Sequence, residues 1–329
     1  MLSLPPALFL VMLELTVGSF VSLYFLDVRG DTSRGFVLFQ GVLYFIFAVL
    51  TLLAMNAFAS PAVVHGRGLD EPWLDAQGPL MVAFLLLMIP WNVLLWLDRQ
   101  PRPARGKAAR EAAPARPTRL RLARFATGGL TALTGAATLF VVGMAYRTLA
   151  SSRLDGAFVV ATFLLGGIAL GGVMTAMLLG HWYLNTPTAS GKPLEFATII
   201  TVAALALELL FTLVIGPSTA HTTLKTVTVS PGTQITTGQN GVVISTPTVA
   251  PGQTAPTTAQ VREAPLSTGA MFGLQFIMGF LAPLVLGGVA LWLARGRSFQ
   301  SATGMLYLCV SFIFIGEILG RGLLLLPVF

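Results

Sequence analysis

Long apolar runs separated by short polar segments cover most of the chain. The runs approach the ~20 residues that an α-helix needs to cross about 30 Å of hydrocarbon. Eight membrane-spanning helices are predicted on this basis, at residues 4–26, 36–58, 79–97, 126–149, 157–179, 196–215, 269–293 and 304–327. The sequence therefore predicts an all-α integral membrane protein, in which a bundle of eight transmembrane helices forms a single polytopic domain over residues 1–329.

The composition agrees with this pattern. Hydrophobic residues make up 55% of the 329 residues and charged residues 10%, whereas about a quarter of the residues in soluble proteins are charged. These proportions exclude a soluble enzyme core and indicate that most of the chain lies in the lipid bilayer. No Lys or Arg precedes the first apolar run, which contains Glu14. We therefore expect a retained helix and not a cleaved signal peptide.

Lys and Arg are distributed unevenly between alternate loops. Of the 20 residues, 14 lie in the loops on one side of the predicted bundle, 27–35, 98–125, 180–195 and 294–303. The connections on the other side hold only 4 of them. Because an excess of Lys and Arg marks the cytoplasmic side of a membrane protein, the prediction is that both termini lie outside.

Two loops are distinctive. Residues 98–125 are rich in Pro, Ala and Arg and are predicted to form a mobile cytoplasmic linker that touches anionic head groups, so nucleic acid is not expected as a partner. Residues 216–268 form an outer loop rich in Thr, Pro and Gly. Apolar and polar residues alternate there around Asn240 and Gly241, which is typical of a β-hairpin. A flexible polar loop is the alternative.

Ionisable groups at membrane depth are the first functional candidates, because each costs several kcal/mol unless it is paired or solvated. Glu14 and Glu208 lie near the middle of predicted spans, and Glu317 and Arg321 lie in the outer half of the last one. Arg147 is close enough to the outer surface to extend its charge into water. Hydrogen bonding between helices is the alternative reading of Glu14 and Glu208.

The sharpest local pattern is Gly316-Glu317-Ile318-Leu319-Gly320-Arg321. The carboxylate and the guanidinium are one turn apart and can pair, and the two glycines allow another helix to approach closely. The pair is either a structural lock or a proton-accepting carboxylate beside a cation, and both roles are compatible. A second GxxxG spacing, in residues 164–180, predicts another close-packing surface.

Metal-binding residues are few. Cys309 is the single cysteine and lies in an apolar run, so no zinc site or iron-sulfur cluster ligated by cysteines of this chain alone is expected. His65 and His221 fall in predicted outer loops, and His181 is at a helix end. Haem held between two histidines at membrane depth is therefore not expected.

The last span, MLYLCVSFIFIGEILGRGLLLL, resembles the final helix of the membrane anchor subunits of the dimethyl sulfoxide reductase type, within the polysulfide-reductase-like quinol anchors. The specific part is the Gly-Glu-x-x-Gly-Arg-Gly pattern, and eight spans with both ends outside agree with it. The resemblance implies a respiratory subunit of the inner (cytoplasmic) membrane that binds menaquinone or ubiquinone and has no haem or metal of its own. It also implies an iron-sulfur subunit and a molybdopterin catalytic subunit on the outer face.

The resemblance also implies roles for individual residues. Glu317 would accept a proton from quinol and Arg321 would orient or tune it, while Glu14, Asn56 and Glu208 would line the quinone pocket. Electrons would pass to the cluster of the partner subunit.

One departure concerns the second span. The resembled anchors carry a His shortly before a Gly-Ser-Pro at its outer end, whereas this chain reads MNAFASP at residues 55–61. The residues that can replace the His there are Asn56 and His65, and Asn92 of the third span is a further amide. The alternatives from other classes are a membrane scaffold without quinol turnover and a small-solute transporter, for which Pro90 and Pro283 would supply kinks.

Overall fold

The computed structural model describes residues 4–57, 63–64, 67–98, 119–150, 153–186, 189–215 and 268–325. Eight helical stretches in these ranges are long and apolar enough to cross a membrane, which confirms the all-α bundle of a multi-pass membrane protein. The helices are α1 (Leu4–Arg29), α2 (Arg34–Ala57), α3 (Glu71–Leu97), α5 (Arg119–Tyr146), α6 (Arg153–Asn185), α7 (Lys192–Ile215), α8 (Thr268–Gln275), α9 (Ala282–Arg295) and α10 (Phe299–Leu325). A 3-10 turn, η1 (Arg147–Leu149), extends α5, and a π-helical segment, η3 (Phe276–Leu281), joins α8 to α9.

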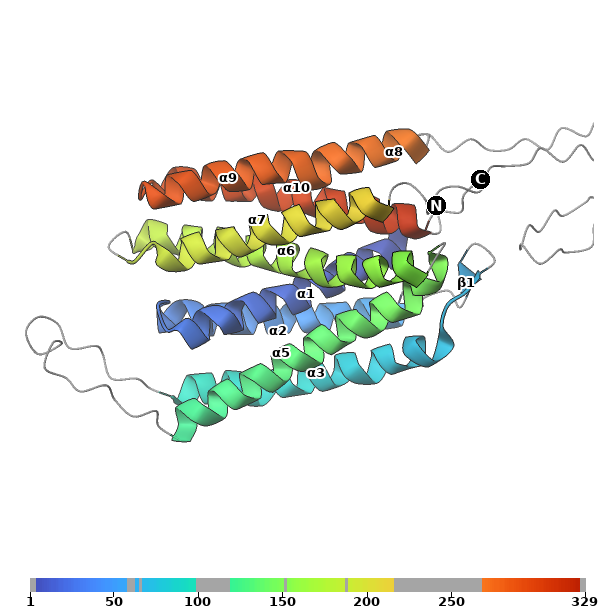
Figure 1. Cartoon of the computed structure of the whole chain (residues 1–329). Helices are drawn as coiled ribbons and strands as arrows, with labels where there is room; N and C mark the ends of the chain where they lie inside the picture. The colour runs from blue at the N-terminus through green and yellow to red at the C-terminus, as the bar shows by residue number, and fades with distance from the viewer. Residues whose placement is uncertain are drawn as a thin grey trace, which may run out of the picture.

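The helices lie side by side along one common direction (Figure 1). We call the end where α1 begins and α10 ends the terminal end, and the opposite end, where α1 ends and α10 begins, the basic end. Helix α1 lies inside the bundle and contacts α2, α5, α6, α7 and α10. A residue of α1 therefore has neighbours on most of the other helices, which makes this helix the natural place for a shared site.

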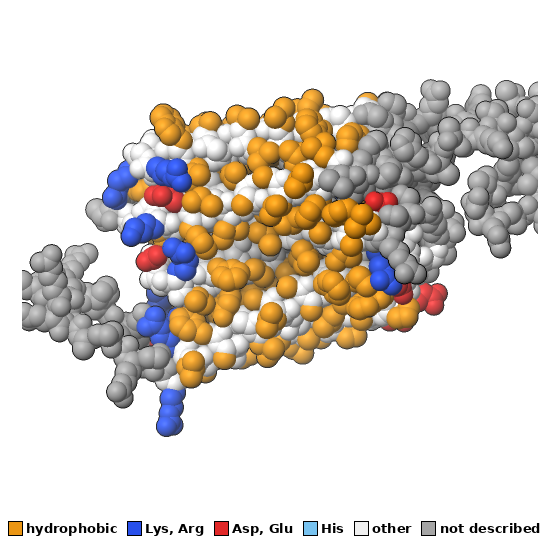
Figure 2. All heavy atoms as spheres, in the orientation of Figure 1, with side chains coloured by type: hydrophobic (Ala, Val, Ile, Leu, Met, Phe, Trp, Pro, Cys, Tyr) orange, Lys and Arg blue, Asp and Glu red, His pale blue; other side chains and the backbone are white. Residues whose placement is uncertain are grey.

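Apolar side chains cover the face of the bundle that Figure 2 shows, between its two ends. Large residues such as Trp292 and Leu133 are exposed there, as expected for helix faces in contact with lipid. Lys and Arg gather at the basic end (Figure 2), where the described residues include Arg29, Arg34, Arg119, Arg121, Arg124, Lys192, Arg295 and Arg297. The terminal end has fewer, namely Arg67, Arg147 and Arg153.

Helices α1 and α6 meet backbone to backbone at three glycines. A Cβ on Gly18 would lie 1.6 Å from the carbonyl oxygen of Gly167, and a Cβ on Gly171 would lie 1.8 Å from the carbonyl carbon of Gly18. Only glycine fits at these positions. The predicted close-packing surface in residues 164–180 is therefore confirmed, and its partner is α1.

Two predicted helix starts differ most from the structure. Helix α5 begins at Arg119 and not at 126, so the last part of the predicted linker is helical. Helix α3 begins at Glu71 and not at 79, because a Pro at its first positions starts the helix well before the apolar run. Both extensions carry polar residues, among them Glu71 and Arg124.

The loops are only partly described. A two-residue strand pair, β1 (Val63–Val64) with β2 (Arg67–Gly68), precedes α3. The predicted linker residues 99–118 and the predicted hairpin around Asn240 and Gly241 lie outside the described residues. Pro283, predicted as a kink, is the second residue of α9, which follows the π-helical segment η3.

Candidate functional site

Four ionisable side chains from three helices meet inside the bundle. Arg321 Nη2 of α10 lies 2.5 Å from Glu14 Oε1 of α1, 3.2 Å from Glu317 Oε2 of its own helix and 3.8 Å from Glu208 Oε1 of α7. All four residues are buried, with exposures of 0 to 6%. We call Glu14, Glu208, Glu317 and Arg321 the carboxyl cluster.

A fourth helix holds the arginine in place. Arg321 Nη1 donates to Thr162 Oγ1 at 3.3 Å and Nη2 donates to the Thr162 carbonyl oxygen at 3.1 Å, both on α6. The guanidinium carbon also lies 4.1 Å from the centre of the Phe163 ring, a distance at which a cation is attracted to the ring face. The position of Arg321 is thus fixed by α1, α6 and α10 together.

Gly166 provides the space for this arrangement. A Cβ at Gly166 would lie 2.9 Å from Arg321 Nη2 and 3.0 Å from Glu317 Oε1. The helix face that carries Thr162, Phe163 and Gly166 was not among the candidates from sequence. The only signal was the glycine-rich stretch, and that pattern indicates close packing in general without indicating a charged neighbour.

The cluster has more acidic groups than basic ones. One guanidinium faces three carboxyl groups, and four ionised groups would leave two negative charges uncompensated in a buried site. Glu208 and Glu317 are also within hydrogen-bonding reach of each other. Two carboxyl groups can form a hydrogen bond only when one of them carries a proton. The arrangement is therefore suited to binding and releasing protons.

The cluster lies nearer the terminal end than the basic end. At ~1.5 Å per residue, Glu14 is about 15 Å along α1 from Leu4 and Glu208 is about 10 Å along α7 from Ile215. On the same basis, Arg321 is about 6 Å from Leu325 at the end of α10. A proton released from the cluster has the shorter route to the terminal end.

The two candidate amides bond within their own helices. Asn56 is exposed, and its Nδ2 donates to the Leu52 carbonyl oxygen of its own helix at 3.1 Å. Asn92 donates in the same way to the Met88 carbonyl oxygen at 2.9 Å. His65 lies outside the described residues. The structure therefore brings Glu14, Glu208, Glu317 and Arg321 together but gives Asn56 no hydrogen bond or ion pair with them in its described part.

Arg147 lies in the 3-10 turn η1 and is partly exposed. Its guanidinium pairs with Asp70 at 2.9 Å, and its side chain is 44% exposed. His181, at the basic end of α6, lies 3.5 Å from the Tyr307 hydroxyl group.

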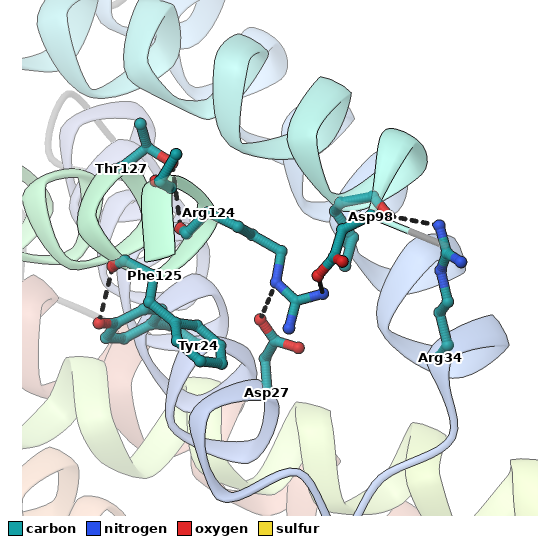
Figure 3. A network of polar contacts seen from close by, with 9 residues as sticks. Tyr24, Asp27, Arg34, Asp98, Arg124, Phe125 and Thr127 are labelled. Carbon is teal, nitrogen blue, oxygen red and sulfur yellow. Dashed lines mark hydrogen bonds and ion pairs between the residues drawn. The ribbon is translucent and has the colours of Figure 1, made fainter. Parts of the chain in front are cut away.

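A second buried network lies at the basic end, as Figure 3 shows. Arg124 of α5 reaches between Asp27 of α1, at 3.3 Å, and Asp98, the residue that ends α3, at 2.8 Å. Arg124 is 2% exposed. Sequence reasoning placed these three residues in loops, and nothing in the sequence indicated that they would meet.

Further contacts complete the network at the basic end. Arg34 Nη2 of α2 donates to the carbonyl oxygens of Leu95 and Trp96, both at 2.8 Å, and a cation there complements the C-terminal dipole of α3. The Tyr24 hydroxyl group donates to the Phe125 carbonyl oxygen at 3.0 Å (Figure 3). Helices α1, α2, α3 and α5 are thereby joined at the base of the predicted linker.

Comparison with known proteins finds no match among protein-family models, curated proteins or solved structures. Within the described residues, no group of three or more His, Cys, Asp or Glu side chains is arranged to hold a metal ion. The fold and the site define a multi-pass helical membrane protein with a buried cluster of carboxyl groups around one arginine. Its function is inferred from that geometry.

Proposed function

We propose that this chain is the quinol-reactive membrane anchor subunit of a multisubunit respiratory oxidoreductase. The observation that carries the proposal is the meeting of Glu317 and Arg321, the pair in the Gly-Glu-x-x-Gly-Arg motif of α10, with Glu14 and Glu208 of two other helices. An isolated ion pair would need only Glu317 and Arg321. The two additional buried acids supply sites for protons.

The chemistry of quinol matches this donor set. Bound quinol supplies two electrons and two protons on oxidation, and the protons need acceptors within hydrogen-bond reach. Glu208 Oε2 is buried without a hydrogen-bond partner among the described residues, so a quinol hydroxyl group would be its partner, and Arg321 holds the neighbouring carboxylates in place. Glu14, Glu208 and Glu317 are the residues that would receive the protons, and Asn56 stays a candidate for the lining of the quinone pocket.

The proposed orientation places the cluster on the outer side of the inner (cytoplasmic) membrane. The gathering of Lys and Arg at the basic end favours that end as cytoplasmic. The terminal end would then face the iron-sulfur subunit and the molybdopterin catalytic subunit, with a β-hairpin in residues 216–268 available for contact. Electrons would then leave the site at the terminal end, which is also the end to which the protons have the shorter route.

Purification of the full chain from its native membrane in mild detergent tests this proposal. We expect an iron-sulfur protein and menaquinone or ubiquinone to co-purify, as measured by mass spectrometry and metal analysis. Glu317→Gln should assemble normally but lose most quinol-dependent electron transfer, because an amide cannot accept a proton. Glu195→Gln is the matched control, since Glu195 lies in the first turn of α7, toward the basic end. A metal-free, quinone-free chain, or full activity in Glu317→Gln, would contradict the proposal.

A small-solute transporter is the second candidate. It is favoured by the fact that the carboxyl cluster is built entirely by this chain, since a proton-coupled carrier would need no partner. Solute flux driven by a proton gradient in liposomes that contain only this chain would support it. A membrane scaffold without quinol turnover would show neither solute flux nor quinol oxidation. Substitution of Arg321 would still destabilise the bundle in that case.

A further inference from the structure

We propose that Glu208 carries an exchangeable proton in the carboxyl cluster, while Glu14 and Glu317 are the ionised carboxyl groups that pair with Arg321. The inference deepens the proposed function, because it names the first proton-binding group of the same site. The proton site itself rests on the geometry of the cluster and exists whether or not quinol is the partner.

The distances to Arg321 rank the three acids. Glu14 and Glu317 lie 2.5 and 3.2 Å from Nη2, within direct hydrogen-bonding distance, whereas Glu208 lies 3.8 Å away. The two closer carboxylates therefore take most of the stabilisation that the guanidinium offers. Glu208 gains least from the cation and is the group whose ionised form is least compensated.

The rest of the guanidinium is already engaged. Both nitrogens that face α6 donate to Thr162, and the flat face of the group lies against Phe163. The guanidinium fills the space beside Gly166, since a Cβ there would lie 2.9 Å from Nη2. Arg321 cannot turn toward Glu208 without giving up these contacts.

Glu317 is the hydrogen-bond acceptor for a proton on Glu208. The two carboxyl groups are within hydrogen-bonding reach, so a protonated Glu208 donates to the Glu317 carboxylate. The other oxygen, Oε2, is buried and has no hydrogen-bond partner among the described residues. One oxygen of Glu208 thus holds a proton in the cluster, and Oε2 is the atom left to bind an incoming proton.

Among the described residues, Arg321 is the one cation that faces Glu208. In the described part of the chain, the charged groups that face it are Glu14 from α1 and Glu317 and Arg321 from α10. The other ionisable residues of α7, Lys192 and Glu195, lie in its first turn, toward the basic end. No alternative positive charge on α7 is therefore placed to keep Glu208 ionised.

Infrared spectroscopy of the purified full-length chain, without added quinone, tests the inference. A protonated carboxyl group has a C=O stretching band that ionised carboxylates lack and that shifts in D2O. We expect this band at neutral pH, its shift within minutes of transfer to D2O, and its loss in the difference spectrum of Glu208→Gln. Glu195→Gln, the same substitution on the same helix, should keep the full band.

Three results would overturn the inference. The first is an unchanged band in Glu208→Gln, which would place the proton elsewhere. The second is the absence of any band in the unaltered chain, since all carboxyl groups would then be ionised. The third is a band that stays unshifted after long incubation in D2O, since the proton would then be fixed. Quinol-dependent activity is measured in a separate experiment. The infrared results therefore test the proton on Glu208 even if the anchor proposal fails.

Discussion

Gly166 is the residue on which the geometry of the carboxyl cluster depends most directly. Its missing Cβ leaves the space that Arg321 and Glu317 fill. Arg321 is held on several sides by Glu14, Thr162 and Phe163, so it cannot move away from an added methyl group at low cost. The charged side chain of Arg321 therefore requires a glycine at position 166.

Gly166→Ala is therefore expected to destabilise the protein by about 1–3 kcal/mol, because the added Cβ overpacks a filled site. Thermal unfolding in detergent measures the effect. Gly304→Ala on α10 is the matched control, because nothing lies within 4 Å of a Cβ there. It should leave the transition unchanged or raise it slightly, since Ala favours helix more than Gly. Equal effects of the two substitutions would refute the steric role of Gly166.

Arg124→Gln tests the network at the basic end. The substitution leaves Asp27 and Asp98 buried without their cation, and removing one partner of a buried pair costs about 3–5 kcal/mol. Arg147→Gln breaks a pair whose arginine is 44% exposed, and such pairs contribute below about 1 kcal/mol. Unfolding midpoints of the two variants should differ clearly. Similar midpoints would mean that Arg124 is solvated in the membrane.

The candidate residues were predictable from the sequence, but their meeting was predictable only in part. Glu317 and Arg321 are one helical turn apart, so their ion pair followed from spacing alone and is confirmed at 3.2 Å. Glu14 and Glu208 come from helices far apart in the chain, and periodicity within one helix does not say which helix packs against it. Thr162 acts partly through its backbone carbonyl oxygen, which no residue type reveals.

At the scale of elements, the contact between α1 and α6 is set by glycines on both helices. Gly18 meets Gly167 and Gly171 at distances that exclude any side chain. This contact brings Glu14, one turn before Gly18, beside the α6 face that holds Arg321. Packing of two backbones thus positions the acid that lies closest to the arginine.

Gly18→Ala should be among the most damaging single-methyl changes in the chain. A Cβ there would lie 1.6 Å from a backbone oxygen of α6, and backbone cannot rotate away as a side chain can. We expect destabilisation at or above the upper end of about 1–3 kcal/mol, together with loss of any activity that depends on Glu14. Yield of folded protein by size-exclusion chromatography checks this. A variant with normal yield and stability would show that α1 and α6 can separate.

The eight spans were predictable because hydrophobic length is a direct consequence of bilayer thickness. The glycine spacing of α10 also predicted a close approach, and a Cβ on Gly316 would indeed lie 2.1 Å from Gly279 Cα. Its partner, the π-helical segment η3, was not predictable. The early start of α5 was missed because its first turns are rich in arginine, which resembles a linker in composition although Arg124 is buried.

At the scale of the whole molecule, the two ends of the bundle differ in charge and in chemistry. The basic end carries most of the described Lys and Arg and the network around Arg124 (Figures 2 and 3). The carboxyl cluster lies toward the opposite end. If the basic end is cytoplasmic, protons that leave the cluster by the shorter route are released outside. The direction of proton release therefore depends on the orientation of the bundle.

Single introduced cysteines test the orientation. Cys309 is the single cysteine of the sequence and is fully buried, so it should not react with a membrane-impermeant thiol reagent. Asp75 at the terminal end and Ser298 at the basic end are both exposed. In sealed vesicles with the original outer face outward, Asp75→Cys should be labelled and Ser298→Cys protected, and inverted vesicles should give the reverse. The opposite pattern would place the carboxyl cluster near the cytoplasm, where an outer iron-sulfur partner could not receive electrons from a quinol bound beside it.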